Sequence, residues 1–336
     1  TTMIILGIET SCDETSAAIV RDGTEVLCNI IASTKEVFAQ SGGVVPEDAA
    51  RRQVELILPV LHSAIAEAGL AYTDIDAIAV TKGPGLMGSL LVGVMAARTL
   101  SFIHNIPLIG VHHTLGHLSS VWLEQEDSPE FPCLTLSVSG GHSDLWLRTS
   151  HTDGKRIGKT RDDAAGEAFD KGAAMLGLPY PGGPSISKSA NSGDPSAFDF
   201  PIALLKEPTC DFSFSGLKNS LRLAVLKHAG DLEKLQSNLA ASYQEAICAQ
   251  LCHRVAHALT LYPDVKEVHV VGGVSANTRL REMLQSTIAA RALRTPKTIP
   301  YCTDNAAMIA AAGYFLYKDN PKQSLDAFIT STSTSL

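Results

Sequence analysis

Two segments of the chain place short apolar runs on either side of a polar turn, which is the pattern of a β-hairpin. The first, MIILGIETSCDETSAAIV, covers residues 3–20, with TSCDET as its turn. The second, CLTLSVSGGHSDLWL, covers residues 133–147, with SGGH as its turn. Because each hairpin opens a long stretch of further helical and strand patterns, the sequence predicts a duplicated architecture of two lobes.

Between the hairpins, the apolar pattern alternates between the periods of helices and strands. Helical spacing covers residues 50–69 and 88–104, and short apolar runs at 76–80 and 106–111 predict buried strands. The second of these strands leads directly into HHTLGH. Strands that alternate with helices predict an α/β fold with largely covered sheets.

The second half of the chain continues the alternation after a region rich in glycine, proline and serine. Residues 160–218 are predicted to form loops over a site. A long helix is expected over 231–261. KEVHVVGG at 266–273 predicts a buried strand that ends in a glycine turn, and VSANTRLREMLQ then predicts a helix that begins at a Ser/Asn cap.

Composition restricts the class of protein. A chain of 336 residues with 45% hydrophobic content can bury a large core, and its length favours two domains. The best membrane-length candidate, residues 88–104, carries Arg98 and has helical periodicity. The first residues lack a secretory signal pattern, and seven scattered cysteines without CxxC pairs suit a reducing compartment. The protein is expected in the cytoplasm and outside membranes.

The net charge of −8 argues against a protein that grips nucleic acid over its whole surface. Two basic runs could still form local patches. They are Lys155, Arg156, Lys159 and Arg161, and then Arg279, Arg281, Arg291, Arg294 and Lys297. A solvated surface is the favoured interpretation of each run.

Two histidines in VHHTLGHLSS, His113 and His117, have the spacing of metal ligands, because residues four apart lie on one helical face. Chance is a rival, since roughly 0.4 such pairs are expected among 11 histidines, and His253 and His257 repeat the spacing. A zinc peptidase would carry a glutamate as general base after the first histidine, but Thr114 stands there. A metal at this pair would hold or polarise a substrate.

Asp304, in YCTDNAAM, is the natural third ligand, because divalent metals accept a carboxylate beside imidazoles. Its alternative role is a plain cap on a helix over residues 305–317. IPYC at 299–302 predicts a strand before it. Cys248 and Cys252, near the second histidine pair, are not interpreted as a zinc site, because ligands that all project from one helix cannot surround a tetrahedral ion.

Glycine-rich turns offer candidate phosphate sites. KGPGLMGSLL contains GxGxxG, but no acidic residue follows between Gly88 and Glu124 to hold a ribose, and Pro84 lacks a backbone N–H, so a tight turn is favoured. SGGH at 139–142 and GGVSAN at 272–277 are better candidates, since glycines at a strand end let N–H groups approach an anion. With the TSCDET hairpin they indicate nucleotide binding. No Walker motif occurs.

Ten motifs resemble, in order, those of the TsaD family (older name Gcp; eukaryotic relative OSGEP), the tRNA N6-adenosine threonylcarbamoyltransferases. They are GIETSCDET, GGVVPE, KGPGL-G-LLVG, HHTLGH, VSGGH, DDAAGEAFDK, YPGGP, FSFSGLK, GGVSAN and CTDNAAM. The resemblance implies a two-lobed actin-like ATPase (ASKHA) fold with duplicated mixed-sheet subdomains. The N-terminal lobe is expected at 1–112 plus about 306–330, the C-terminal lobe at 113–305, and a nucleotide and metal cleft between them.

The resemblance also implies site residues and cofactors. One divalent metal per subunit, Fe²⁺ or Zn²⁺, is expected on His113, His117 and Asp304. Asp13 and Glu14 are similar to acidic residues that matter for transfer. An adenine nucleotide or threonylcarbamoyl-AMP is expected at Ser137, Val138, Ser139, Gly140, Gly141, Asp170, Gly183 and Asn277. Gln53 departs from the family pattern, where a histidine is common after GGVVPE, and this puts in doubt any role assigned to that position.

The implied activity transfers the threonylcarbamoyl group from threonylcarbamoyl-AMP to N6 of adenosine 37 in tRNAs that read ANN codons, with release of AMP. The implied partners are the tRNA anticodon loop, TsaB, TsaE and a TsaC-type supplier of the adenylate in bacteria, or a second copy of the chain in organelles. The apolar helix at 88–104 is a candidate docking face for TsaB, with a core helix as the alternative. The alternative functions are a glycoprotease-like metallopeptidase and a non-catalytic nucleotide-binding regulator.

Overall fold

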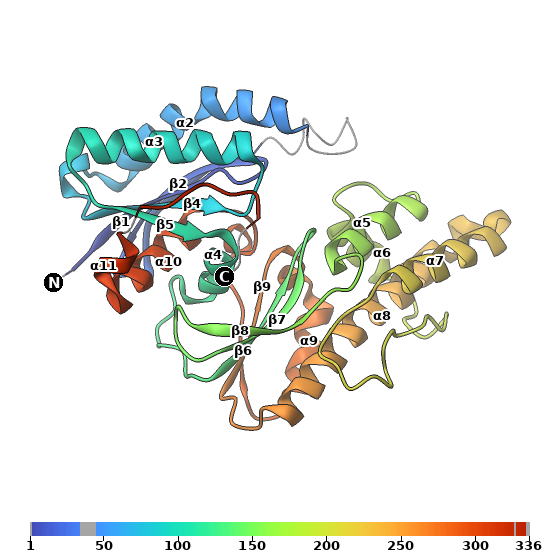
Figure 1. Cartoon of the computed structure of the whole chain (residues 1–336). Coiled ribbons are helices and arrows are strands. Elements are labelled where there is room, and N and C mark those ends of the chain that lie inside the picture. Colours follow the sequence, from blue (N-terminus) through green and yellow to red (C-terminus); the bar gives the residue numbers. More distant parts are fainter. Residues whose placement is uncertain (1, 34–44, 326, 334–336) are drawn as a thin grey trace. The chain divides into compact units, whose positions relative to one another are not determined.

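The computed structural model describes residues 2–33, 45–325 and 327–333, so part of the GGVVPE motif lies outside the described residues. The chain forms two compact units, unit 1 at 1–129 plus 296–336 and unit 2 at 130–295 (Figure 1). These boundaries differ from the expected ones at 112/113 and 305/306. Residues 113–129 and 296–305 belong to unit 1. The first of these segments does so because the helix that begins at His113 packs on the last long helix of the chain.

The sheet of unit 1 contains the first predicted hairpin. Its strands are β1 (Ile4–Glu9), β2 (Glu14–Arg21), β3 (Glu25–Ser33), β4 (Ala77–Gly83) and β5 (Leu108–His112), in the order β3-β2-β1-β4-β5. Strands β1 and β2 pair antiparallel, as do β2 and β3, whereas β1, β4 and β5 run parallel. The hairpin and both expected strands are therefore confirmed.

The sheet of unit 2 repeats this plan. Its strands are β6 (Cys133–Val138), β7 (Ser143–Arg148), β8 (Gly154–Lys159), β9 (Glu267–Val271) and β10 (Ala292–Arg294), in the order β10-β9-β6-β7-β8. Strands β6, β7 and β8 form an antiparallel meander, and β9 and β10 continue parallel to β6. When the sheet is followed from β8 to β10, its strand order and strand directions match those of unit 1 from β3 to β5. This match confirms the duplication expected from the two hairpins.

Helices cover both faces of the sheet of unit 1 (Figure 1). They are α2 (Pro46–Ala68), α3 (Met87–His104), α4 (His113–Ser119), α10 (Ala306–Asp319) and α11 (Pro321–Ser324). Side chains alternate along β1, so Ile5 packs with α10 while Leu6 and Ile8 pack with α2 and α3. Gly7 allows α10 to approach β1 closely, since a Cβ there would lie 2.2 Å from the Ala306 carbonyl oxygen.

Two expectations about loops and strands are wrong. IPYC forms a 3₁₀ turn at Ile299–Cys302, because Pro300 lies in its first turn and favours helical backbone angles. The region 160–218 contains α5 (Ala165–Met175), α6 (Gly182–Ala190) and the start of α7 (Ser215–Lys227). Alanine supplies the helix propensity of α5, and Pro184 in the first turn of α6 is compatible with a helix start.

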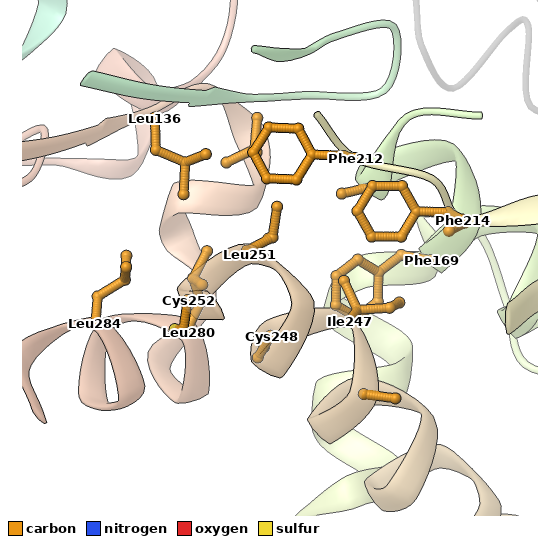
Figure 2. Close-up of a cluster of buried hydrophobic side chains, with 14 of the residues drawn as sticks. Leu136, Phe169, Phe212, Phe214, Ile247, Cys248, Leu251, Cys252, Leu280 and Leu284 are labelled. Carbon is orange, nitrogen blue, oxygen red and sulfur yellow. The ribbon is translucent and has the colours of Figure 1, made fainter. Parts of the chain in front are cut away.

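The other predicted helices of unit 2 are confirmed. Helix α8 extends over Leu232–Leu261, and α9 covers Thr278–Thr287 with the Asn277 side chain as its N-cap. Figure 2 shows the core that these helices form with β6, where Cys248 and Cys252 lie among leucine, isoleucine and phenylalanine side chains. Burial raises the pKa of Cys252 to about 11. Both cysteines are therefore small apolar core residues, as the sequence interpretation held.

A buried ionic cluster stabilises the other face of the unit 2 sheet. His269 Nε2 lies 2.9 Å from Glu267 Oε2, and Arg294 donates to both Glu267 oxygens at 2.6 and 3.0 Å. Burial alone would raise the pKa of Glu267, but the hydrogen bonds from His269 and Arg294 and the charge of Arg294 lower it to about 2.

The Glu267→Gln variant should lower the free energy of unfolding by about 3 kcal/mol at neutral pH, because it removes the buried negative charge that pairs with Arg294. The pKa of Glu267 is depressed in the folded protein, so this contribution is present above the ordinary glutamate pKa of 4.5 and is lost as pH falls toward 2. Urea unfolding of wild type and variant between pH 7 and pH 3 should show two curves that converge as the pH falls. A constant difference across that range would contradict the assignment.

Candidate metal centre and nucleotide-binding loops

Helix α4 places two imidazoles side by side. Strand β5 ends at His112, whose Nδ1 accepts a hydrogen bond from the Thr114 N–H at 3.2 Å and caps the helix. His113 and His117 then lie one turn apart, with their Nε2 atoms separated by 3.1 Å. Gly116 between them permits α10 to pack on α4, because a Cβ there would lie 2.6 Å from Cδ1 of Ile309.

The start of α10 supplies the third group. Asn305, not Asp304, caps this helix by accepting from the Met308 N–H at 3.1 Å, so the capping alternative for Asp304 is wrong. Asp304 Oδ1 instead lies 3.0 Å from Nε2 of His117 and 3.6 Å from Nε2 of His113. The Ser16 hydroxyl accepts from the Ala306 N–H at 2.9 Å and fixes the helix start against β2.

These three side chains fit a divalent metal. Their donor atoms all lie within 4.8 Å of one another, and this is the one such group of three or more His, Cys, Asp or Glu residues among the described parts of the chain. Two imidazole nitrogens and one carboxylate oxygen suit Fe²⁺ or Zn²⁺, and three protein ligands leave coordination positions open. His253 and His257 join no such group in the described residues.

The metal group has an anionic neighbour that the sequence interpretation missed. Glu9, at the end of β1, places Oε2 3.0 Å from Nδ1 of His113. Burial alone would lower the pKa of His113, but the charges of Glu9 and Asp304 raise it to about 9. Burial favours the neutral acid of Glu9, yet His113 lowers the Glu9 pKa below its ordinary value. The sequence does contain one signal for Glu9, since it is a carboxylate in an otherwise apolar predicted strand.

The loop that follows Glu9 carries the two predicted acidic residues and lies beside the metal group. Ser11 Oγ is 3.2 Å from Nδ1 of His113. Burial and the charges of Asp13, Asp304 and Glu9 raise the pKa of Cys12 to about 12, which places the loop in the same anionic field. Asp13 is half-buried, and Glu14 is buried at the start of β2.

Gln53 holds this loop from α2. Its buried side-chain nitrogen donates to the carbonyl oxygens of Thr10, Cys12 and Glu14 at 3.3, 3.0 and 3.0 Å. Gln53 therefore fixes the loop through backbone carbonyl oxygens, which every residue type provides. The departure from the family pattern leaves the loop anchored, because an amide donor serves these carbonyls.

In unit 2, the SGGH turn has an exposed backbone without side chains at Gly140 and Gly141. The Ser139 N–H donates to the His142 carbonyl at 2.8 Å, and the Ser139 hydroxyl accepts from the His142 N–H at 3.1 Å. A Cβ built on Gly140 or Gly141 would meet nothing within 4 Å. The turn therefore leaves room for a ligand to approach its backbone, as an anion site requires.

The other predicted nucleotide residues of unit 2 are joined to this turn by close contacts. The Gly166 N–H of α5 donates to the Ser139 carbonyl at 3.1 Å. Further along α5, Asp170 Oδ1 accepts from the Gly182 N–H at 2.7 Å, next to Gly183 with its open Cβ position. Gly272 needs its positive φ of 87° and its lack of a side chain, because a Cβ would lie 2.3 Å from the Val138 carbonyl.

The side chain of Asn277 is hydrogen-bonded to other residues of unit 2. Its carbonyl oxygen caps α9 at the Leu280 N–H, and its amide nitrogen donates to Ser187 Oγ at 3.0 Å and Gln244 Oε1 at 2.8 Å. It therefore ties α6, α8 and α9 together. Contact between its amide nitrogen and a nucleotide would require exchange of one of these bonds.

Several side chains of the two basic runs bind other residues of the chain. Arg161 pairs with Glu207 and Asp211, and Arg279 forms a two-nitrogen contact with Glu245. Arg291 of the second run donates to the backbone carbonyls of Pro263 and Val265. Arg294 of the same run forms a salt bridge with Glu267. These contacts support a structural role for four of the nine basic residues.

Comparison with known proteins identifies the family. The family described as "TsaD: tRNA N6-adenosine threonylcarbamoyltransferase" matches residues 25–311. The chain is 49% identical over 325 residues to the tRNA N6-adenosine threonylcarbamoyltransferase of Symbiobacterium thermophilum, covering 96% of this chain and 94% of the relative. It is 50% identical over 318 residues to the enzyme of the same name from Moorella thermoacetica, covering 93% and 92%.

Solved structures with low sequence identity show the fold alone. HypF of T. kodakarensis matches with a TM-score of 0.63 at 14% identity, covering 97% of this chain and 49% of HypF. The (R)-2-hydroxyglutaryl-CoA dehydratase component A of Acidaminococcus fermentans matches with a TM-score of 0.56 at 14% identity, covering 94% and 99%. Both have the actin-like ATPase fold that was expected. By its relatives and its family match, the chain belongs to the TsaD family of tRNA N6-adenosine threonylcarbamoyltransferases.

Proposed function

We propose that this chain transfers the threonylcarbamoyl group from threonylcarbamoyl-AMP to N6 of adenosine 37 in tRNAs that read ANN codons. The product is N6-threonylcarbamoyladenosine, and AMP is released. The observation that carries the proposal is the His113, His117 and Asp304 group in a chain about half identical to enzymes of this name. A peptidase would need a general base at Thr114, and that residue has no acidic side chain.

The reaction joins a weak nucleophile to an activated carbamoyl group. The adenine N6 forms a bond to the carbamoyl carbon, the bond from that carbon to the phosphate oxygen breaks, and N6 loses one proton. Bound divalent metal would supply Lewis-acid stabilisation of charge on the acyl donor. The SGGH turn and the backbone near Gly183 would hold the phosphate and ribose of the leaving AMP, and Asp13 or Glu14 would accept the N6 proton.

The direct test supplies the purified chain with preformed threonylcarbamoyl-AMP and unmodified tRNA, and measures modified nucleoside by mass spectrometry after digestion. A tRNA with guanosine at position 37 is the matched control, because it lacks the N6 amine. Product with the chain alone would indicate the organellar, homodimeric type. Product only after addition of TsaB and TsaE would indicate the bacterial type, in which a TsaC-type enzyme supplies the adenylate. No product under either condition would refute the proposal.

The metal is proposed to be one Fe²⁺ or Zn²⁺ per chain. Both ions accept imidazole and carboxylate ligands, so the donor set does not choose between them. Metal analysis of protein purified without affinity-tag metals gives identity and stoichiometry. We also propose that the protein acts in the cytoplasm, because its seven scattered cysteines suit a reducing compartment.

TsaB is proposed to dock on the outer side of α2 and α3, which lie next to each other over the sheet of unit 1 (Figure 1). By length and composition alone, α3 could also span a membrane. Val94 and Ala97 of α3 pack into the core of unit 1, whereas Leu91 and Met95 are 44% and 55% exposed. On α2, Leu58 is 70% exposed. Adjacent exposed apolar side chains of this kind favour a protein interface.

The Leu91→Glu variant should weaken TsaB binding by at least about 30-fold, because it places a charge in the desolvated centre of the interface (about 2 kcal/mol or more). Leu226→Glu on α7 is the matched control, since Leu226 is 62% exposed and lies in unit 2. Isothermal titration calorimetry with TsaB measures both affinities. Equal affinity of wild type and Leu91→Glu would remove α3 from the interface.

A further inference from the structure

Glu9 is a buried carboxylate whose oxygens contact His113 of the metal group, the backbone of Ser11 and the hydroxyl of Thr81 in β4. Its side chain is 1% exposed. Oε2 lies 3.0 Å from Nδ1 of His113 and accepts from the Thr81 hydroxyl at 2.7 Å, while Oε1 accepts from the Ser11 N–H. A buried carboxylate is costly unless it is paired, so this arrangement needs its partners.

The contact decides which nitrogen of His113 can bind a metal. A neutral imidazole has one N–H and one lone pair. Because Nδ1 faces a carboxylate, that nitrogen carries the hydrogen, and the lone pair of Nε2 then points toward His117 and Asp304. No hydrogen-bond partner is found for the buried Nδ1 of His117 in the described structure, so the histidine pair has one anchored ring and one that lacks such an anchor.

We propose that Glu9 is a positioning residue that sets the tautomer and ring orientation of His113. Through its second oxygen it also ties the metal ligand to the backbone of Ser11, at the start of the loop that carries Asp13 and Glu14. The proposal rests on the proposed metal site and extends it to a residue that does not itself bind the ion. Glu9 would therefore affect the affinity for the metal and the position of the acidic loop relative to the metal group.

The test is the Glu9→Gln variant, which keeps the shape of the side chain and removes its charge. Metal-free protein is titrated with Zn²⁺ in competition with a chromophoric chelator. We expect the dissociation constant for Zn²⁺ to rise by about 10- to 100-fold, the size of effect typical of carboxylates behind metal-binding histidines. Glu9→Asp, which keeps the charge, should recover part of the affinity.

The matched control is Glu267→Gln. Glu267 is also a buried glutamate in contact with a histidine, at 2.9 Å from His269, but that histidine is not part of the metal group. Urea unfolding of the metal-free proteins should show that both glutamine variants lose stability. Only Glu9→Gln should lose Zn²⁺ affinity, and a purely structural role for Glu9 would make the two variants alike.

Thr81→Val provides a second test if Glu9→Gln does not fold. This near-isosteric change removes one hydrogen bond to Glu9 without touching His113, and should weaken Zn²⁺ binding by about 2- to 10-fold. Failure of wild type to bind Zn²⁺ would refute the metal site itself. Wild-type binding with unchanged affinity in Glu9→Gln, or in Thr81→Val where Glu9→Gln does not fold, would overturn the role of Glu9 and leave the metal site standing.

Discussion

Replacing His113 with alanine should abolish metal binding and threonylcarbamoyl transfer together. The variant removes one of three converging donors and leaves Asp304 facing a single imidazole. Stabilisation of developing charge by a metal is worth several kcal/mol, so loss of the ion corresponds to a fall in transfer rate of about 10³-fold or more. Metal analysis and a single-turnover assay on the same preparation measure the two losses.

The sequence supplies the control for this experiment. His253→Ala removes a histidine from a pair with the same spacing that joins no metal group in the described residues. It should keep both metal content and activity. An active, metal-free His113→Ala variant would refute the role of the metal, and an inactive variant with full metal content would place the effect of His113 elsewhere.

The sequence predicted the parts of the fold that depend on local pattern. Both hairpins, the parallel strands and α8 follow from period and turn residues, which act over a few positions. The domain boundary was placed differently because α4 joins unit 1 through packing of Gly116 on Ile309, almost 200 residues away. A contact of that range leaves no local signal.

The metal ligands were found because they carry a spacing and a chemistry that can be read from residues. Asp304 was harder, since an aspartate before a helix has an ordinary use as a cap. Asn305 takes that use in the structure and so frees Asp304 for the histidines. Glu9 had only one signal in the sequence, its place as a carboxylate in an apolar strand. The roles of Glu9 and Gln53 could not be predicted, because they consist of hydrogen bonds to His113 and to three backbone carbonyls.

Folding does not require glycine at position 141, but phosphate binding at the SGGH turn would. Many glycines of the chain are required by packing, as Gly7 and Gly272 are, and a side chain there would collide with backbone. A Cβ on Gly141 would meet no atom within 4 Å, and its φ is not in the left-handed region. If the turn binds phosphate, the reason for glycine is the space that a ligand must enter.

The Gly141→Val variant should therefore fold with a free energy of unfolding within about 0.5 kcal/mol of wild type. It should still weaken AMP binding by about 100-fold, because branched methyl groups would keep the phosphate from the backbone N–H groups and charge-assisted hydrogen bonds of about 1.5–3 kcal/mol would be lost. Gly230→Val, at another glycine whose Cβ position is open, is the control and should bind AMP normally. Calorimetric titration with AMP separates the cases, and wild-type affinity in Gly141→Val would show that the phosphate binds away from this turn.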